Sequence, residues 1–292
     1  MKRVLILGAT GMLGNALYKV LKDKYKLVLS VRDPQKVELL EKMHGGTQAH
    51  EVIEFHAAKI YDDFLNKKGH PGIYLSDFLN RLGDIDYVIN AIGVTIPFAM
   101  ENPALTFFIN GALPHVLAQT FGDKLIHITT DCVYNGLDGY PYDENSSKTP
   151  VDIYGLSKSL GEPTTCLTLR TSIIGRELEG FTGLLEWFLQ QDGKEIGGFS
   201  NHYWNGLTTI QFAKLCDEIM EHRERYPRAG IYHVFSTSVS KYDMLKKIKD
   251  KYGSSTIIKE NPDAHLNRTL TTQHDLVTVL HIPSFDQMID EL

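Results

Sequence analysis

Apolar residues follow two different periods along the first part of the chain. Val4–Leu7 is a continuous apolar run, which is typical of a strand buried on both faces of a parallel sheet. From Met12 to Lys22 the apolar side chains recur at helical spacing, so they share one face of a predicted helix. Further strands are predicted at 26–31, 52–55, 86–91, 124–129 and 166–170, and further helices at 35–43, 73–82, 103–121 and 154–162.

Strands that alternate with helices in this way predict an α/β fold, a Rossmann-type doubly wound parallel sheet. After residue 172 the alternation is less regular. The patterns there predict helices at 184–191, 210–222 and 241–252, and a strand at 231–235. We therefore expect residues 1–172 to form the doubly wound domain and residues 173–292 to form a smaller C-terminal α/β lobe, interleaved with it at the edges.

Composition excludes several classes of protein. The chain has 292 residues, a net charge of −6 and 42% hydrophobic residues, without the basic character of a nucleic-acid-binding surface. Its cysteines, Cys132, Cys166 and Cys216, are widely spaced, which disfavours a disulfide framework or a metal site. No apolar run approaches the roughly 18 residues of a membrane span. We expect a cytoplasmic protein with no metal, no membrane partner and no nucleic-acid partner.

A glycine-rich turn joins the first strand to the first helix. Positions 8–14 read GATGMLG, which is GxxGxxG spacing. Glycine allows a sharp turn and a close approach of the backbone to a pyrophosphate, while the helix N-terminus offers free N–H donors. In this strand–turn–helix context the motif predicts an NAD(P)-binding domain. The predicted cofactor contacts in the turn are Gly8, Thr10, Gly11, Met12 and Gly14.

The second strand ends at the position that usually distinguishes NAD from NADP. Arg32 is a permanently charged fork suited to a ribose 2′-phosphate, whereas Asp33 is suited to the ribose hydroxyls of NAD. We favour NADP through Arg32, with NAD as the open alternative.

Tyr154 and Lys158 form a YxxxK pair, and residues at this spacing share a face of a helix. A free phenol titrates near about 10, and a nearby lysine cation favours the phenolate, so Lys158 is expected to lower the pKa of Tyr154. Lys158 can also reach a cofactor ribose. One strand earlier, the hydroxyl of Thr130 is placed to polarise a substrate carbonyl.

Together these features resemble the extended short-chain dehydrogenase/reductases. The residues that carry the resemblance are the GATGMLG turn, Asn90-Ala91-Ile92-Gly93, Asn110, Thr129-Thr130-Asp131, and Tyr154 with Lys158. Within that superfamily the chain looks most like the dTDP-4-dehydrorhamnose reductase branch. The segments that suggest this branch are TTDCVYNG at 129–136, PVDIYGLSKSLGE at 150–162 and LRTSIIG at 169–175.

The resemblance implies NAD(P)H-dependent reduction of a 4-keto group on a nucleotide-linked deoxysugar, in polysaccharide or deoxysugar biosynthesis. Thr130 would polarise the carbonyl, Tyr154 would supply the proton, and Lys158 would bind the cofactor ribose. A homodimer formed through the helices at 103 and 154 is also implied. Three further residues would line the cofactor groove, namely Asn90, Ala91 and Gly93.

The C-terminal lobe is expected to bind the nucleotide-sugar substrate. Arg268 is a candidate partner of its diphosphate, and Trp204 a candidate for stacking on its base or sugar. Plain packing for Trp204 and a solvated loop for Arg268 are the open alternatives. The remaining substrate candidates are Thr95, Thr130 and Tyr134.

Two other activities remain open at this point. A nucleotide-sugar epimerase would keep NAD tightly bound, and a non-catalytic NADP-binding subunit would resemble the regulatory subunits of methionine adenosyltransferase. The TTD stretch and Arg32 favour a reductase. Related 4,6-dehydratases carry Thr-Asp-Glu where this chain has Cys132, so a dehydratase is disfavoured.

Overall fold

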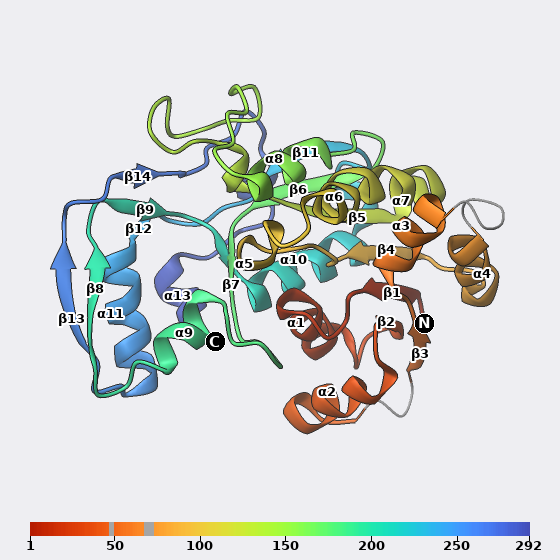
Figure 1. The fold of residues 1–292 in the computed structure, drawn as a ribbon, viewed down its shortest axis with the longest axis horizontal. Coiled ribbons are helices and arrows are strands. Elements are labelled where there is room, and N and C mark those ends of the chain that lie inside the picture. The colour runs from red at the N-terminus through yellow and green to blue at the C-terminus, as the bar shows by residue number, and fades with distance from the viewer. Residues whose placement is uncertain (47–49, 67–72) are drawn as a thin grey trace.

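The structure is a computed structural model that describes residues 1–46, 50–66 and 73–292. Its main sheet is built from β1 (Arg3–Leu7), β2 (Lys26–Val31), β3 (Glu51–Glu54), β4 (Tyr87–Asn90), β5 (Leu125–Thr130), β6 (Leu167–Thr171) and β11 (Gly230–His233). The strands lie in the order β11-β6-β5-β4-β1-β2-β3, and each neighbouring pair is parallel. The predicted α/β fold with a parallel doubly wound sheet is confirmed (Figure 1).

Successive residues of β1 belong to apolar clusters on opposite faces of the sheet, because side chains alternate along a strand. Val4 and Ile6 belong to one cluster, and Leu5 and Leu7 to the other. The first cluster is covered by α1 (Met12–Leu21), α2 (Val37–His44) and α10 (Thr209–Glu221). The second is covered by α3 (Ala57–Asn66), α4 (Ile73–Leu82) and α7 (Leu113–Phe121).

The C-terminal part adds short strands and helices beside the main sheet, on the left in Figure 1. Its strand pairs are β7 (Ile173–Ile174) with β10 (Leu207–Thr208), β8 (Glu195–Phe199) with β13 (Ile257–Asn261), and β9 (His202–Trp204) with both β12 (Val239–Ser240) and β14 (Leu266–Asn267). Its helices are α9 (Leu184–Leu189), α11 (Lys241–Tyr252), α12 (Leu276–Val279) and α13 (Phe285–Ile289).

The chain returns from this part to the main sheet. Helix α10 packs against α1, and β11 pairs with β6 in parallel from Gly230–Leu167 to His233–Arg170. β11, which follows the predicted division at residue 172, therefore belongs to the same sheet as the strands that precede it.

The helix predicted at 103–121 is interrupted in the structure. It consists of α6 (Pro103–Phe107), a π-helical turn (Phe108–Ala112) and α7. The interruption turns Asn110 towards the site described below, and such π turns are frequent at functional sites. Helix α3 was not predicted, although Ala57, Ile60, Tyr61 and Phe64 recur at helical spacing along it.

Candidate active site

The turn after β1 fits a dinucleotide pyrophosphate. Gly8 has a φ of +81°, and a Cβ on Gly14 would lie 2.1 Å from the Gly8 carbonyl oxygen, so both positions require glycine. Gly11 is the N-cap residue of α1, and among the described residues no side chain caps this helix. The first N–H groups of α1 therefore stay available to an anion, as a pyrophosphate site requires.

A cavity of about 550 Å³ opens beside this turn. It is bounded by the glycine turn, the end of β2, the residues after β3 and the segment after β4. The predicted residues that line it are Gly8, Thr10, Gly11, Arg32, Ala91, Gly93 and Thr95. Gly14 packs against the backbone of Gly8 and Ala9 in the turn. Neither Gly14 nor Met12 lines the cavity.

Arg32 and Asp33 have different positions at the end of β2. Arg32 is exposed and lines the cavity. The Asp33 carboxylate instead accepts a hydrogen bond from the Gln35 backbone N–H at 3.0 Å and caps the short 3₁₀ turn Pro34–Lys36. The charged side chain that faces the cavity is therefore the arginine.

Asn90 lies behind the cavity wall, which differs from the prediction that it lines the groove. Its side chain is buried, and its Oδ1 accepts a hydrogen bond from the Ile92 N–H at 3.1 Å. Its Nδ2 lies 3.1 Å from His127 Nδ1, and His127 Nε2 lies 2.9 Å from the Gly161 carbonyl. Asn90 thus shapes the turn after β4 and is linked through His127 to Gly161, at the end of the helix 153–160.

The predicted catalytic residues come from β5 and α8 (Ile153–Leu160), which contact each other. Thr130 is the last residue of β5, and its side chain acts on the Tyr154 phenol, whose pKa it lowers. Its Oγ1 also accepts the Cys132 N–H at 3.1 Å and lies 3.2 Å from Asp131 Oδ1. Lys158 is buried, and its ammonium donates to the Ile128 carbonyl at 2.9 Å.

The pKa values of this pair differ from the prediction. Burial, followed by the charge of Cys132, raises the pKa of Tyr154, and the hydrogen bond with Thr130 opposes this only in part. Burial lowers the pKa of Lys158 to about 8, although the charge of Glu162 opposes the shift. The expected lowering of the Tyr154 pKa by Lys158 is therefore not observed, and the phenol is protonated at neutral pH.

Two glycines bring α8 into direct contact with neighbouring backbone. A Cβ on Gly155 would lie 2.2 Å from the Cys132 carbonyl oxygen, and one on Gly161 would lie 1.8 Å from the Asn110 carbonyl oxygen. The Asn110 side chain donates to Ser157 Oγ at 3.1 Å. It also bonds both the N–H and the carbonyl of Val94, at 2.8 and 2.9 Å. The helix that carries Tyr154 and Lys158 is therefore fixed at both ends.

A buried polar network lies beside this helix. Arg170 donates two hydrogen bonds to the Glu162 carboxylate, at 2.9 and 2.7 Å. Its Nη1 lies 2.7 Å from both Tyr134 Oη and His233 Nε2. Tyr134 is fully buried and stacks on Tyr142 with a centroid distance of 4.2 Å. Its position argues against the predicted contact with substrate.

The other substrate candidates have mixed positions. Trp204 is buried in the main apolar cluster and packs edge-on against Phe285, which favours its packing alternative. Arg268 is partly exposed and reaches the segment after β5, where its Nε donates to the Tyr134 carbonyl at 2.9 Å. Thr95 is exposed at the edge of the cavity.

Two charged residues near the site were not among the predicted contacts. Asp131 is buried; burial raises its pKa, and the charges of Arg268 and Lys241 oppose the shift. Burial lowers the pKa of Lys241 to about 8. The TTD stretch was a signal for Asp131, whereas Lys241 stands in an ordinary amphipathic helix with no local signal.

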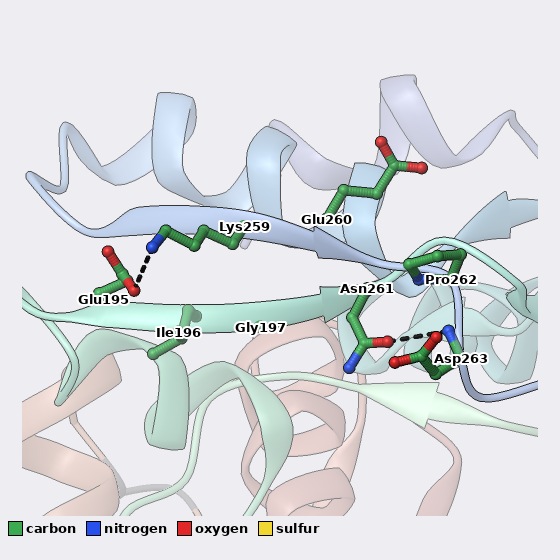
Figure 2. A pocket seen from close by; sticks show the side chains of 8 residues that line it. All are labelled: Glu195, Ile196, Gly197, Lys259, Glu260, Asn261, Pro262 and Asp263. Atoms are coloured by element: carbon green, nitrogen blue, oxygen red, sulfur yellow. Dashed lines mark hydrogen bonds and ion pairs between the residues drawn. The ribbon is translucent and has the colours of Figure 1, made fainter.

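A second hollow, of about 390 Å³, follows β8 and β13 on the surface (Figure 2). The ion pair between Lys259 and Glu195 spans the two strands at 2.6 Å. The hollow is lined by residues 195–197 and 259–263, which include no predicted site residue. In the parts of the chain that the structure describes, no helix is both long and apolar enough to cross a membrane.

Known proteins similar to this chain include curated relatives in polysaccharide pathways. The spore coat polysaccharide biosynthesis protein SpsK of Bacillus subtilis is 27% identical over 265 residues, which are 88% of this chain and 82% of SpsK. The probable low-salt glycan biosynthesis reductase Agl14 of Haloferax volcanii is 28% identical over 203 residues, 63% of this chain and 66% of the relative.

Solved structures share the fold at lower identity. A hypothetical dTDP-4-dehydrorhamnose reductase from Sulfolobus tokodaii has a TM-score of 0.69 at 23% identity, with 97% of each chain covered. The Bacillus anthracis dTDP-4-dehydrorhamnose reductase in complex with NADP has a TM-score of 0.67 at 18% identity, covering 100% of this chain and 98% of that one. The profile of the RmlD substrate binding domain matches residues 76–273, more than half of the chain. The chain therefore belongs to the RmlD substrate binding domain family, as its resemblance to dTDP-4-dehydrorhamnose reductases predicts.

Proposed function

We propose that this protein is an NADPH-dependent reductase of a 4-keto group on a nucleotide-linked deoxysugar, acting in polysaccharide or glycan biosynthesis. Membership of the RmlD substrate binding domain family supports the substrate class. The names of SpsK and Agl14 support a role in polysaccharide or glycan synthesis, and Agl14 is named as a reductase.

The observation that carries the proposal is the contact of α8, which holds Tyr154 and Lys158, with β5, which ends at Thr130, in a sheet whose glycine turn fits a dinucleotide. When bound, NADPH supplies a hydride to the carbonyl carbon. Tyr154 then gives its phenolic proton to the carbonyl oxygen, which becomes a hydroxyl, and Thr130 polarises that oxygen through its hydroxyl group. Lys158 binds the cofactor ribose.

The protonation state of Tyr154 suits reduction. The pKa of the phenol lies above neutral and burial raises it further, so Tyr154 carries at neutral pH the proton that a ketone reduction needs. The α8 helix holds this phenol in place through the contacts of Gly155 and Gly161. A fixed acid loses little orientation entropy when the substrate binds.

The preference for NADP rests on the end of β2. Arg32 lines the cavity, and its guanidinium matches the geometry of a phosphate monoester. Asp33, the residue suited to the NAD ribose, is occupied as a turn cap. We therefore propose that Arg32 binds the 2′-phosphate.

Oxidation of NADPH and of NADH at 340 nm, with a panel of nucleotide-linked 4-keto-6-deoxysugars, tests the proposal. We expect a substrate-dependent loss of absorbance that is abolished in Tyr154→Phe, while NADPH still binds. Tyr203→Phe, an exposed tyrosine on β9, is the control and is expected to retain activity. Cofactor binding without turnover on any substrate would refute the reductase, and NAD retained through purification would favour the epimerase.

We also propose a homodimer in which the predicted helices, α6 at Pro103 and α8 at Tyr154, contribute to the interface. The two helices contact each other, and the exposed apolar side chains of α8 include Leu156 and Leu160. Light scattering on wild type and Leu160→Glu tests this, because a dimer formed there should dissociate in the variant. The cytoplasm is proposed as the site of action, which cell fractionation tests.

A further inference from the structure

Two cations from the C-terminal part of the chain reach the end of β5. Arg268 follows β14, and its Nη1 lies 3.5 Å from the Cys132 sulfur while its Nε bonds the Tyr134 carbonyl. Cys132 is two residues after Thr130, so the guanidinium lies beside the catalytic hydroxyl groups. The chain pairs here through the Asn267 N–H and the Gly136 carbonyl at 2.7 Å, which fixes the position of Arg268.

Lys241 is the first residue of α11 and follows Ser240, which pairs with Tyr203 of β9. Arg268 follows Asn267, which pairs with the same Tyr203. Both cations therefore start from strands that flank β9. Its ammonium lies over the Trp204 ring, 5.4 Å from the centroid, and acts electrostatically on Asp131 and Cys132. A cation is disfavoured at a helix N-terminus by the macrodipole, and burial adds a further cost. This lysine therefore occupies a position that local structure does not favour.

The hydrogen-bonding capacity of Lys241 is largely unused. An ammonium has three donors. Within the described residues the Lys241 ammonium donates to the Met244 sulfur at 4.0 Å, and a thioether sulfur is a weak acceptor. Lys241 is only partly buried, so a ligand can reach it. An oxygen anion placed beside the ammonium would supply the acceptors that the protein itself does not.

The charge around this point is unbalanced. Lys241 and Arg268 both act on the buried carboxylate of Asp131, so two cations face one buried anion. Asp152 also acts on Cys132, but its side chain is exposed and caps α8 through the Gly155 N–H. Nearby His202 has its pKa lowered to about 4, by burial and then by Lys241 and Arg268, so it adds no charge at neutral pH.

We propose that Lys241 and Arg268 together form an oxyanion-binding site of the substrate pocket, next to Thr130 and Tyr154, with Lys241 as a specificity-determining residue. The oxyanion is either the diphosphate of the nucleotide or a carboxylate on the sugar. This inference rests on the proposed function, because it takes the Thr130 and Tyr154 hydroxyls as the place where the sugar lies. Arg268 was a candidate from the sequence, whereas Lys241 comes from the fold.

Binding measured by calorimetry on the NADPH-bound protein tests the site without turnover. The probes are dTDP against thymidine and UDP against uridine for the diphosphate, and UDP-glucuronic acid against UDP-glucose for the carboxylate. Lys241→Met removes the charge at similar length, and Lys241→Arg retains it. Lys246→Met is the matched control, because Lys246 is an exposed lysine of the same helix. Thermal melts check that each variant is folded.

We expect Lys241→Met to bind the charged member of one pair at least about tenfold more weakly, as for the loss of a hydrogen bond to a charged group. The affinity of Lys241→Met for the uncharged member of that pair should equal that of wild type. Lys241→Arg should recover most of the affinity for the charged member. A loss with dTDP or UDP identifies the diphosphate, and a loss with UDP-glucuronic acid alone identifies a sugar carboxylate.

The inference is overturned if Lys241→Met binds every probe like wild type, or if wild type prefers no charged probe to its uncharged partner. It is also overturned if Lys241→Met fails to fold while the folded Lys241→Arg shows no charge preference. Failure of the proposed function is a separate result, since wild type would then bind the anionic probes but oxidise no NADPH with any ketosugar.

Discussion

The buried ion pair of Arg170 and Glu162 offers a direct test of what holds the site together. Their side chains are 3% and 1% exposed, and two hydrogen bonds of 2.9 and 2.7 Å join them. Arg170→Met removes both bonds. The Glu162 carboxylate then keeps the hydrogen bond from Thr129 and the ion pair with the partly exposed Lys148. It also removes the donor that reaches Tyr134.

The expected cost is about 3–5 kcal/mol in free energy of unfolding, because removing one member of a buried pair leaves an uncompensated buried charge. The double variant Arg170→Met, Glu162→Leu removes both charges. Its loss of unfolding free energy should be smaller than the sum of the losses of the two single variants by at least about 1 kcal/mol. For comparison, Lys259 and Glu195 are 66% and 52% exposed, so Lys259→Met should cost less than about 1 kcal/mol.

Urea unfolding followed by far-UV circular dichroism measures these differences from the midpoint and slope of each transition. A cost for Arg170→Met no larger than that of Lys259→Met would refute the reasoning. Strict additivity in the double variant would show that the two side chains are not coupled.

Three further outcomes follow from other parts of the site. Arg32→Ala should raise the KM for NADPH by about tenfold or more while leaving the KM for NADH unchanged, since only NADPH carries the phosphate; an equal change in both would contradict the assignment. Gly161→Ala should cost about 1–3 kcal/mol and lower kcat, because its Cβ would lie 1.8 Å from the Asn110 oxygen, whereas Gly197→Ala, with its nearest contact at 4.0 Å, should not lower kcat. Burial would raise the pKa of Glu162, but Arg170 and Lys148 outweigh burial and hold this pKa below its usual value. The ionised carboxylate therefore contributes stability above about pH 4.3, and this contribution is lost as the pH falls through the folded pKa. The free energy of unfolding of Glu162→Gln should therefore fall less steeply with acid than that of wild type.

The elements of the fold that a local sequence pattern encodes were predictable. Val4–Leu7 and the apolar run at 26–31 are buried strands because their neighbours on both faces are helices, and a continuous apolar run requires such burial. The glycine turn was equally readable, since its φ angle and its close contact each demand glycine. The predicted family is confirmed.

Other features depend on contacts between distant segments. Tyr134 and Trp204 were candidates for substrate contact because they are aromatic and near the motifs, but their neighbours Tyr142 and Phe285 bury them. Lys241 acts electrostatically on Asp131 although the two residues are far apart in the sequence, and no local pattern encodes that. The raised pKa of Tyr154 likewise reflects burial, which a helical spacing cannot reveal.

The pairing of β11 with β6 has a consequence for synthesis of the protein. β6 is paired with β5 on one side, and its other edge is covered only when residues 230–233 arrive. A nascent chain that ends before β11 therefore presents unpaired N–H and carbonyl groups along β6, a surface open to pairing with other chains. The ribosome must release β11 before the main sheet is complete, so this sheet cannot finish folding while residues 230–233 are still to be made.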